Sequence, residues 1–594
     1  MYISRVVIRN FRNFANLDIK LQPGVTCIVG ENNTGKTNLL HGIRLALDVN
    51  LSSQYRQLIE QDIHSAVDIA QPQQVLVSLE ISDYEDEENE CALVGAWETG
   101  EEGVARITYR FRPKAAVREE IEAEDRQAGG LTLEDYGWEL VGGGDKDPTE
   151  VGWNEQMGSS VRFSDLQSFH IVFLQALRDV QQDLHSIRSS PLGRLLSVTD
   201  IPEEDKQALT EILRSANQEI TNSDAISATG AAIEKEFRAT AGDAFGMDVR
   251  LGMVEPSFGS IAKALTLLLS NQSLEDFQPD RNGLGINNIL YVSMLMEYFS
   301  RRINLKQTAG QLLLIEEPEA HLHPQLQRVL YAALKDKGFQ TIISTHSTHI
   351  SSLAPLKSLV ILTNRGGAAI SSCAVGSSEL EEREVADLER YLDATRSTLL
   401  YARKVILVEG PAELFLIPAL ANAVRGVDFD RSGISVIPIY GIHFDAYTKI
   451  FSENGLPKKC AVIADGDLKP SDADEDTDIA PDDLESLQGT YVRVFRCKTT
   501  FERALTIEGT LKMLRAAAEE LALDSLFAEL DSAIDALELK DLEDDEWKNL
   551  RDSVLSAAKR VGKARFSQVV SKYASLATKL PKYIREAIDW TTED

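Results

Sequence analysis

The chain has 594 residues, with a hydrophobic fraction of 43%, a charged fraction of 26% and a formal net charge of −32. One hydrophobic core does not usually support this length, so two or three domains are expected. No apolar run approaches the roughly 18 residues that span a bilayer, and the amino terminus has no signal-peptide core. Five scattered cysteines suit a reducing compartment and argue against a structural zinc site. We expect a cytoplasmic protein without a membrane partner.

The acidic balance argues against a broad nucleic-acid-binding surface, because phosphate binding normally needs basic residues. Much of the acid is local, however, in residues 465–485 and 538–546. Any path for DNA would therefore use local basic clusters such as Arg301-Arg302 or Lys458-Lys459.

The first fifty residues predict two strands, then the apolar strand Val25–Val29, a glycine loop and a helix from about Lys36. Residues 30–37 match the GxxxxGK[ST] phosphate loop, whose backbone N–H groups face phosphates. The pattern predicts ATP bound by Lys36 at the terminal phosphates, with the Thr37 hydroxyl on Mg²⁺. The other loop residues expected to contact the nucleotide are Gly30, Asn32, Asn33, Thr34 and Gly35.

Further strands are expected within 75–112, exposed loop near 125–160, and mainly helix from 163 to 275. The nucleotide domain then returns with the buried-type strand Leu312–Ile315, which ends in consecutive acids. By position we assign Glu316 to the Mg²⁺ ion and Glu317 to the base that orients the attacking water.

Two further residues are candidates for the nucleotide site. His346 comes directly after the strand Thr341–Ser344, where a neutral imidazole can hydrogen-bond the terminal phosphate. Gln175 follows Val172–Leu174 and is a candidate for sensing the metal, although one glutamine is a weak signal.

These motifs together resemble the ATPase head of ABC, structural-maintenance-of-chromosomes (SMC) and RecF-type proteins. The resemblance implies that two heads sandwich ATP and that a signature loop of one head completes the other's site. The best candidate is Asn282–Asn287, which departs from the usual serine-glycine-glycine-glutamine form and can also be an ordinary glycine-rich helix entry. His321 and His323 match the loop where paired heads touch.

A second group of acids follows a helical connector. The strand Lys404–Val408 ends at Glu409, with Glu413 one helical turn on, and the strand Ala461–Ala464 ends at Asp465 and Asp467. Carboxyl ends of parallel strands meet at one edge of a sheet, so these acids should share a cleft. Clustered carboxylates need cations, which predicts Mg²⁺ or Mn²⁺, two ions in all, suited to phosphodiester hydrolysis.

Strand-Glu-Gly followed by strand-Asp-x-Asp resembles the Toprim domain of topoisomerases, primases and some nucleases. An ABC-type head followed by Toprim resembles the overcoming-lysogenization-defect (OLD) nucleases, which include the large subunit of Gabija anti-phage systems. That resemblance implies a further metal ligand at Glu502 and a lysine at Lys563 that neutralises the scissile phosphate. Alternatively, Glu502 begins a helix and Lys563 lies on a solvated face. No tyrosine nucleophile is identifiable, which favours hydrolysis by water.

The expected fold is α/β: an ABC/SMC/RecF-like ATPase head with a helical insertion, followed by a Toprim α/β domain with helical additions. The expected parts are the first part of the head at 1–162, a helical and dimer-forming insertion at 163–275, the second part of the head at 276–377, a connector at 378–402 and the Toprim domain at 403–594.

The resulting interpretation is an ATP-binding and ATP-hydrolysing, metal-dependent DNA endonuclease that forms a homodimer or larger oligomer. Family analogy adds anti-phage defence, with a helicase or reverse transcriptase as a possible partner. Two alternatives stay open: a topoisomerase-like or primase-like Toprim enzyme, and a repair scaffold that does not cleave. ATP binding at Lys36 is expected to govern access to Glu409, but the sign of that control is open.

Overall fold

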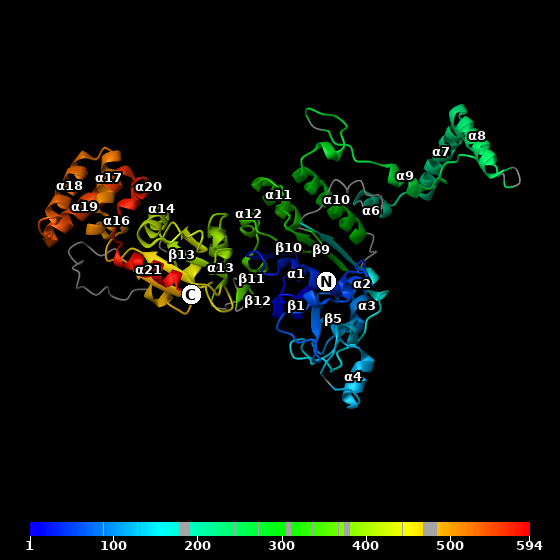
Figure 1. The fold of residues 1–594 in the computed structure, drawn as a ribbon, viewed down its shortest axis with the longest axis horizontal. Helices are drawn as coiled ribbons and strands as arrows, with labels where there is room; N and C mark the ends of the chain where they lie inside the picture. Colours follow the sequence, from blue (N-terminus) through cyan, green and yellow to red (C-terminus); the bar gives the residue numbers. More distant parts are fainter. Residues whose placement is uncertain are drawn as a thin grey trace.

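The computed structural model describes residues 1–86, 88–127, 129–176, 191–242, 245, 247–270, 272–304, 310–335, 337–365, 368–373, 380–441, 444–466 and 484–593. Within these ranges the chain forms an ATPase-head region from two sheets and a carboxyl-terminal region around a third sheet (Figure 1). No helix in the described ranges has both the length and the apolarity needed to cross a bilayer.

The first sheet is antiparallel and contains the amino terminus. Its strand order is β2 (Phe14–Lys20), β1 (Tyr2–Phe11), β4 (Val75–Ser82), β5 (Ala105–Pro113), β6 (Tyr136–Gly142) and β7 (Ser159–Ser160). Short helices border it: α2 (Ser53–Arg56), α3 (Glu88–Val94) and α4 (Ala115–Glu122). Loop was expected over 125–160, yet β6 crosses this stretch because Tyr136 and Leu140 are buried in the sheet's core.

The second sheet carries the nucleotide motifs. Its order is β12 (Ala368–Cys373), β11 (Leu359–Arg365), β3 (Val25–Gly30), β10 (Gln340–Ser344), β9 (Gly310–Glu316) and β8 (Phe169–Leu174). The pairs from β11 to β8 are parallel, and β12 is antiparallel. Because β8 belongs to this sheet, the head extends past the boundary at residue 162 that the sequence predicts.

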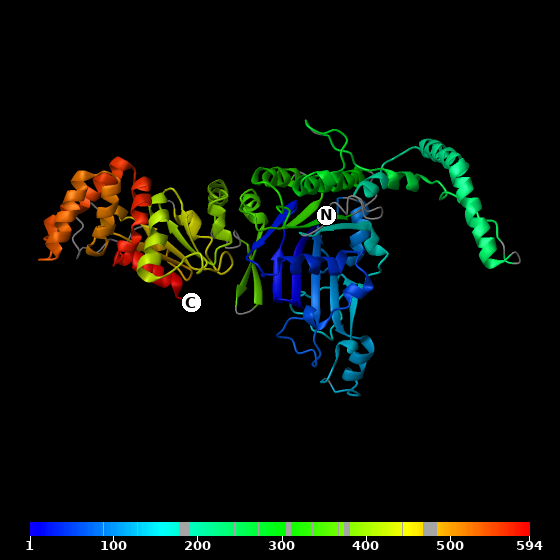
Figure 2. The ribbon, with the colours of Figure 1, turned by 45° about the horizontal axis from the view of Figure 1, so that its top comes forward.

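Helices cover both faces of the second sheet. The phosphate-loop helix α1 (Lys36–Leu47) packs between the two sheets of the head. The helices α10 (Leu284–Asn304) and α11 (Pro324–Lys335) pack on the other face, where Figure 2 shows them as long green ribbons. The short helix α12 (Thr348–Ser351) follows β10. The ends of β3, β9 and β10, which carry Gly30, Glu316 and Ser344, therefore lie along one edge of the second sheet.

The insertion projects away from the head (Figure 1). It contains α6 (Pro191–Ser197), α7 (Glu203–Thr221), α8 (Asp224–Ala241) and α9 (Phe258–Ala264). The mainly helical character was predicted, although the last of these helices already ends at Ala264.

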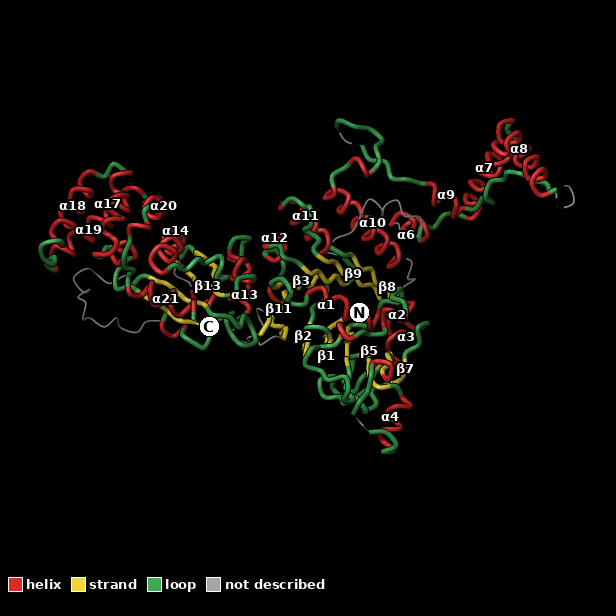
Figure 3. Tube along the Cα trace, viewed as in Figure 1, coloured by secondary structure: helices red, strands yellow, loops and turns green. Residues whose placement is uncertain are grey.

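The third sheet forms the core of the carboxyl-terminal region (Figure 3). It is parallel, in the order β14 (Ile434–Pro438), β13 (Lys404–Val408), β15 (Cys460–Ala464) and β16 (Val492–Arg496). Helices α13 (Glu382–Tyr391), α14 (Pro411–Leu420) and α15 (Phe444–Thr448) connect or flank these strands. The terminal helices are α16 (Phe501–Leu505), α17 (Leu511–Glu520), α18 (Asp524–Leu537), α19 (Asp544–Val561), α20 (Lys563–Lys572) and α21 (Lys582–Thr592).

A joint connects the nucleotide edge of the head to the start of β13; we define it as residues 399–403. The Tyr401 hydroxyl donates to the carbonyl of Ser347 at 3.2 Å, and Arg403 Nε donates to Glu31 Oε2 at 2.9 Å. The Lys458 amine donates to the carbonyls of Leu399, Leu400 and Ala402. The joint is therefore bonded to the head on one side and to the segment entering β15 on the other.

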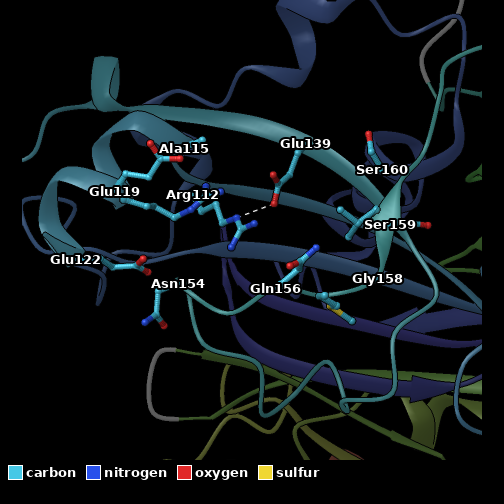
Figure 4. A pocket seen from close by; sticks show the side chains of 13 residues that line it. Arg112, Ala115, Glu119, Glu122, Glu139, Asn154, Gln156, Gly158, Ser159 and Ser160 are labelled. Atoms are coloured by element: carbon cyan, nitrogen blue, oxygen red, sulfur yellow. Dashed lines mark hydrogen bonds and ion pairs between the residues drawn. The ribbon is translucent and has the colours of Figure 1, made fainter.

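A cavity of about 460 Å³ lies on the antiparallel sheet (Figure 4). Arg112 Nε donates to Glu139 Oε1 at 2.6 Å across it, and Arg112 Nη1 donates to the carbonyls of Trp153 and Glu155. These bonds hold residues 153–155 against the sheet.

Candidate nucleotide and metal sites

The phosphate loop begins where β3 ends. Gly30 and Gly35 are required there by space as well as by their φ angles of +157° and +100°: a Cβ on Gly30 would lie 2.4 Å from the Leu362 carbonyl oxygen, and one on Gly35 would lie 2.5 Å from Asn13 Nδ2. Thr34 is buried and donates to the Glu31 carbonyl, while Asn32, Asn33 and Thr37 are exposed. Thr37 Oγ1 is thus accessible to a bound ion.

The Lys36 amine is held back against its own loop. It donates to the carbonyls of Gly30 at 2.9 Å and Glu31 at 2.7 Å. Burial lowers the pKa of this amine to about 8, against the opposing influence of Glu317 and Glu319. The acids after β9 therefore lie within electrostatic reach of the phosphate-loop lysine, as a nucleotide site requires.

The paired acids after β9 have different surroundings. Glu316 is buried; its Oε1 has no hydrogen-bond partner, and its Oε2 accepts from the Ala176 N–H at 3.5 Å. Glu317 adopts a φ of +42° and is half exposed. The register that pairs Leu174 with Ile315 places Gln175 beside Glu316. A buried carboxylate oxygen without a proton donor fits a hard cation such as Mg²⁺.

His346 lies across from Glu317, with Nε2 3.9 Å from Glu317 Oε1. Burial, and then Lys36, lowers the pKa of His346, so the imidazole is neutral near pH 7. Glu319, which sequence reasoning left without a role, orients this loop: its Oε1 accepts from the His346 N–H at 2.6 Å and from Thr345 Oγ1 at 2.9 Å. Glu319 is visible in the sequence as the third acid at the end of β9. Its position alone does not distinguish an acid that forms structural hydrogen bonds from a catalytic acid.

The candidate signature residues 282–287 lead into α10. A Cβ on Gly285 would lie 2.4 Å from the His321 carbonyl oxygen, and Asn288 Nδ2 donates to the Ala320 carbonyl at 3.2 Å. The segment is therefore packed against the loop that carries His321 and His323 in the same chain. Contact with a second head stays a prediction.

The acids of the third sheet do meet at its carboxyl edge. Glu409 follows β13, and its Oε1 accepts from the backbone N–H of Asp465, which follows β15, at 2.7 Å. Glu413 is buried in the first turn of α14 and accepts from the Gly410 N–H at 3.1 Å. Asp467 lies outside the described residues.

Glu502 and Lys563 complete this group from the terminal helices. Glu502 is 1% exposed, and Lys563 forms an ion pair with it, with Nζ 3.0 Å from Oε2. The structure thus brings Lys563, at the start of α20, to the acid in α16 although 60 residues separate them in the chain.

The carboxylates raise one another's pKa values. Burial, then Glu409 and Glu413, raises the pKa of Asp465 to about 8. Burial is also the main reason that the pKa of Glu413 rises to about 7, with Glu409 and Glu502 contributing. Burial opposes the charge on Lys563, but Glu502 and then Asp465 raise its pKa overall. One lysine does not balance these acids, so divalent cations fit the donor set.

No three His, Cys, Asp or Glu side chains within the described ranges already surround a common metal position. Four carboxylates nevertheless converge on one edge, from β13, α14, β15 and α16. Oxygen donors of this kind are those that Mg²⁺ and Mn²⁺ take, usually with several waters in the remaining positions.

Comparisons with known proteins match the same two regions. The family model for an AAA ATPase domain matches residues 1–128 and 163–351. The model described as "Overcoming lysogenization defect protein-like, TOPRIM domain" matches residues 400–467. The ATPase head and the OLD-like Toprim domain predicted from the sequence are therefore confirmed.

Similar proteins extend over most of the chain. It is 22% identical to the endonuclease GajA of Bacillus cereus (strain VD045), over 79% of this chain and 75% of that protein. It is 26% identical to the OLD nuclease of Thermus scotoductus, over 80% and 84%, and 22% identical to the Old nuclease of Escherichia phage P2, over 74% and 73%. A solved structure of the carboxyl-terminal region of the Burkholderia pseudomallei OLD protein is 27% identical and covers 32% of this chain and 97% of that one, with a TM-score of 0.25.

Proposed function

Because the chain belongs to the AAA ATPase domain family and joins that domain to an OLD-like Toprim domain, we propose that it is an ATP-hydrolysing, divalent-metal-dependent DNA endonuclease. The observation that carries this proposal is the convergence of Glu409, Glu413, Asp465 and Glu502 beside Lys563. The printed names of similar proteins, one an endonuclease and two OLD nucleases, support the same reaction class.

In this proposal Glu409, Asp465, Asp467 and Glu502 hold Mg²⁺ or Mn²⁺, with Glu413 beside them. Divalent ions held by these residues would supply an activated water and charge stabilisation for an in-line displacement. Lys563 faces the scissile phosphate and offsets its developing charge. Glu409 accepts the Asp465 N–H, which keeps the two strand-end acids in register.

Direct hydrolysis is favoured over a covalent protein–DNA intermediate. Tyr583 is a tyrosine close to Asp465 and Glu413, but it is only 8% exposed and its hydroxyl is buried. A phosphodiester cannot reach that hydroxyl from solvent, so it does not fit the role of a nucleophile.

In the head, we assign Lys36 to the terminal phosphates of ATP, Thr37 and Glu316 to its Mg²⁺ ion, and Glu317 to the attacking water. His346, neutral beside Lys36, is a hydrogen-bonding partner for the terminal phosphate. Gln175 lies next to Glu316 and is positioned to report on the same ion.

We propose that the joint, residues 399–403, communicates between the two sites. Glu31 belongs to the phosphate loop and contacts Arg403, while Ser347 follows the sensor His346 and contacts Tyr401. From this joint β13 runs directly to Glu409, and β15, whose entry is bonded to the joint through Lys458, runs to Asp465. Movement of the phosphate loop on ATP binding would thus be transmitted to both acid-bearing strands.

The projecting insertion is proposed as a homodimer surface. Its large apolar side chains are exposed: Ile212 at 67%, Phe245 at 73%, Met247 at 68% and Val254 at 85%. Exposed apolar side chains gathered on one segment are typical of a protein–protein contact. We further propose a cytoplasmic role in anti-phage defence, supported by the similarity to OLD nucleases, with DNA as the substrate.

The test is cleavage of supercoiled plasmid with Mg²⁺ or Mn²⁺. The wild type should produce nicked or linear DNA, and Asp465→Ala should reduce the rate by at least about 100-fold because a metal ligand is removed. Asp430→Ala, an exposed acid elsewhere in the same domain, is the matched control and should cleave normally. Covalent protein–DNA adducts would indicate a topoisomerase-like enzyme instead, and absence of cleavage in every nucleotide state would indicate a scaffold.

A further inference from the structure

Cys497 is buried directly behind Asp465. It follows β16, is 5% exposed, and its Sγ donates to Asp465 Oδ1 at 3.4 Å. The thiol belongs to the group of scattered cysteines that the sequence associates only with a reducing compartment, and the hydrolytic mechanism above does not use it. Its contact is nevertheless with the acid on which the proposed nuclease site depends.

The backbone holds this contact in place. The Cys497 N–H donates to the Ala464 carbonyl at 3.3 Å, and the Gly466 N–H donates to the Thr499 carbonyl at 3.0 Å. The two loops approach so closely that a Cβ on Gly466 would lie 2.2 Å from the Cys497 carbonyl oxygen. Backbone hydrogen bonds on both sides of Asp465 therefore connect its segment to the segment that contains Cys497.

The C-terminal helix α21 packs against Cys497. Tyr583, in α21, is buried against Cys497 and near Asp465. Lys404 and Lys459 donate to the last carbonyls of α21, at Thr592, Trp590 and Glu593. Lys404 begins β13 and Lys459 directly precedes β15, so the strands that lead to Glu409 and Asp465 also hold the helix behind the thiol.

We propose that Cys497 is a positioning residue for the metal site: its thiol holds one carboxylate oxygen of Asp465 and so fixes the orientation in which Asp465 binds a divalent cation. This inference rests on the proposed function. Carboxylates that bind metals are commonly oriented by hydrogen bonds from neighbouring groups, and loss of such a partner typically weakens metal binding about 10- to 100-fold. A thiol is a weak donor, which orients the carboxylate while leaving its charge available to the cation.

The experiment measures Mn²⁺ binding to the full-length protein without DNA or nucleotide, by electron paramagnetic resonance. Binding to this site is defined as the part that Asp465→Asn removes. Cys497→Ala should weaken it about 10-fold, whereas Cys497→Ser, which retains a donor, should stay within about 3-fold of the wild type. Plasmid cleavage should follow the same order when Mn²⁺ is limiting and converge when Mn²⁺ is saturating.

Cys460→Ala is the matched control. Cys460 is a fully buried cysteine at the opposite end of β15 from Asp465, so the substitution removes the same atoms without touching the acids. Its Mn²⁺ affinity should equal that of the wild type. The proposal is overturned if Cys497→Ala binds Mn²⁺ normally, if Cys497→Ser is as weak as Cys497→Ala, or if Cys460→Ala is equally weakened. A wild type without Asp465-dependent Mn²⁺ binding would overturn the nuclease proposal as well.

Discussion

The nucleotide site and the Toprim site use the same topology but differ in how their acids are bonded. Each places acids where parallel strands end, at Glu316 and Glu317 in the head and at Glu409 and Asp465 in the Toprim sheet. The head supplies its own cation, since Lys36 lies within reach of Glu317 and Glu319. The Toprim edge sets one lysine against at least four acids, of which Glu413 and Glu502 are buried and Asp465 is half-buried.

The difference shows how similar strand ends acquire different chemistry. In the head, Glu319 Oε1 accepts from Thr345 Oγ1 and from the His346 backbone N–H, so this oxygen holds the loop in place. In the Toprim site, Glu502 is buried and is paired with Lys563, whose Nζ lies 3.0 Å from Oε2. An acid bonded to the backbone organises a loop, whereas buried acids that lie close to one another beside a single lysine suit an external cation.

The largest expected effect separates the two sites completely. Lys36→Ala should lower ATP hydrolysis by about 100-fold or more, because the charge at the terminal phosphates is lost. Metal-dependent nicking without ATP should persist, because Lys36 does not contact the Toprim acids. Malachite-green phosphate release and plasmid nicking measure the two activities, with Lys20→Ala, an exposed lysine on β2, as control. Equal loss of both activities would show that the sites do not work separately.

A second prediction concerns pH and stability in the absence of metal. The pKa of Asp465 is about 8 and that of Glu413 about 7, whereas both acids ionise near pH 4 in an unfolded chain. Between about pH 4 and pH 8 the unfolded state releases protons that the folded state retains, so the free energy of unfolding falls as pH rises. Below about pH 4 this penalty is absent.

We therefore expect the thermal unfolding midpoint in EDTA to fall by several degrees from about pH 5 to pH 8, equivalent to a free energy on the order of 3 kcal/mol. Millimolar Mg²⁺ should offset most of this fall because it stabilises the ionised acids. Asp465→Asn should flatten the pH dependence, and Asp430→Asn should leave it unchanged. A midpoint that rises with pH in EDTA would contradict the charge balance described for this site.

The smallest expected effect tests communication through the joint. The ion pair of Arg403 with Glu31 is partly exposed and worth little to stability, but it is the contact between the phosphate loop and the start of β13. Arg403→Glu should change the ATP response of plasmid cleavage about 2- to 5-fold, in either direction, and the double swap with Glu31→Arg should restore it. Arg425→Glu breaks an ion pair with Asp589 within the Toprim region and should not alter the response. A double swap that behaves like the single variant would contradict transmission through this pair.

Much of the fold could be predicted because its signals are local. Hydrophobic patterning and nearby glycines are enough to recognise the strand, loop and helix around Lys36 and the buried strands that end in acids. Both domains were identified from these local features. The prediction was wrong for β6 over 136–142, because its burial depends on neighbours in β5 rather than on its own sequence. The strand β8 was assigned to the insertion for a similar reason: its partner β9 is about 140 residues away.

The amino-acid sequence alone determined that the chain has a nucleotide site and a carboxylate site. The phosphate loop, and each apolar strand with the acid that follows it, are formed by residues that are adjacent in the chain. Only the tertiary structure decided which side chains support them. The bond from Cys497 to Asp465, the ion pair of Lys563 with Glu502 and the contact of Arg403 with Glu31 join residues that lie 32, 61 and 372 positions apart. Such contacts depend on how helices and sheets pack, and no spacing within a single segment encodes them.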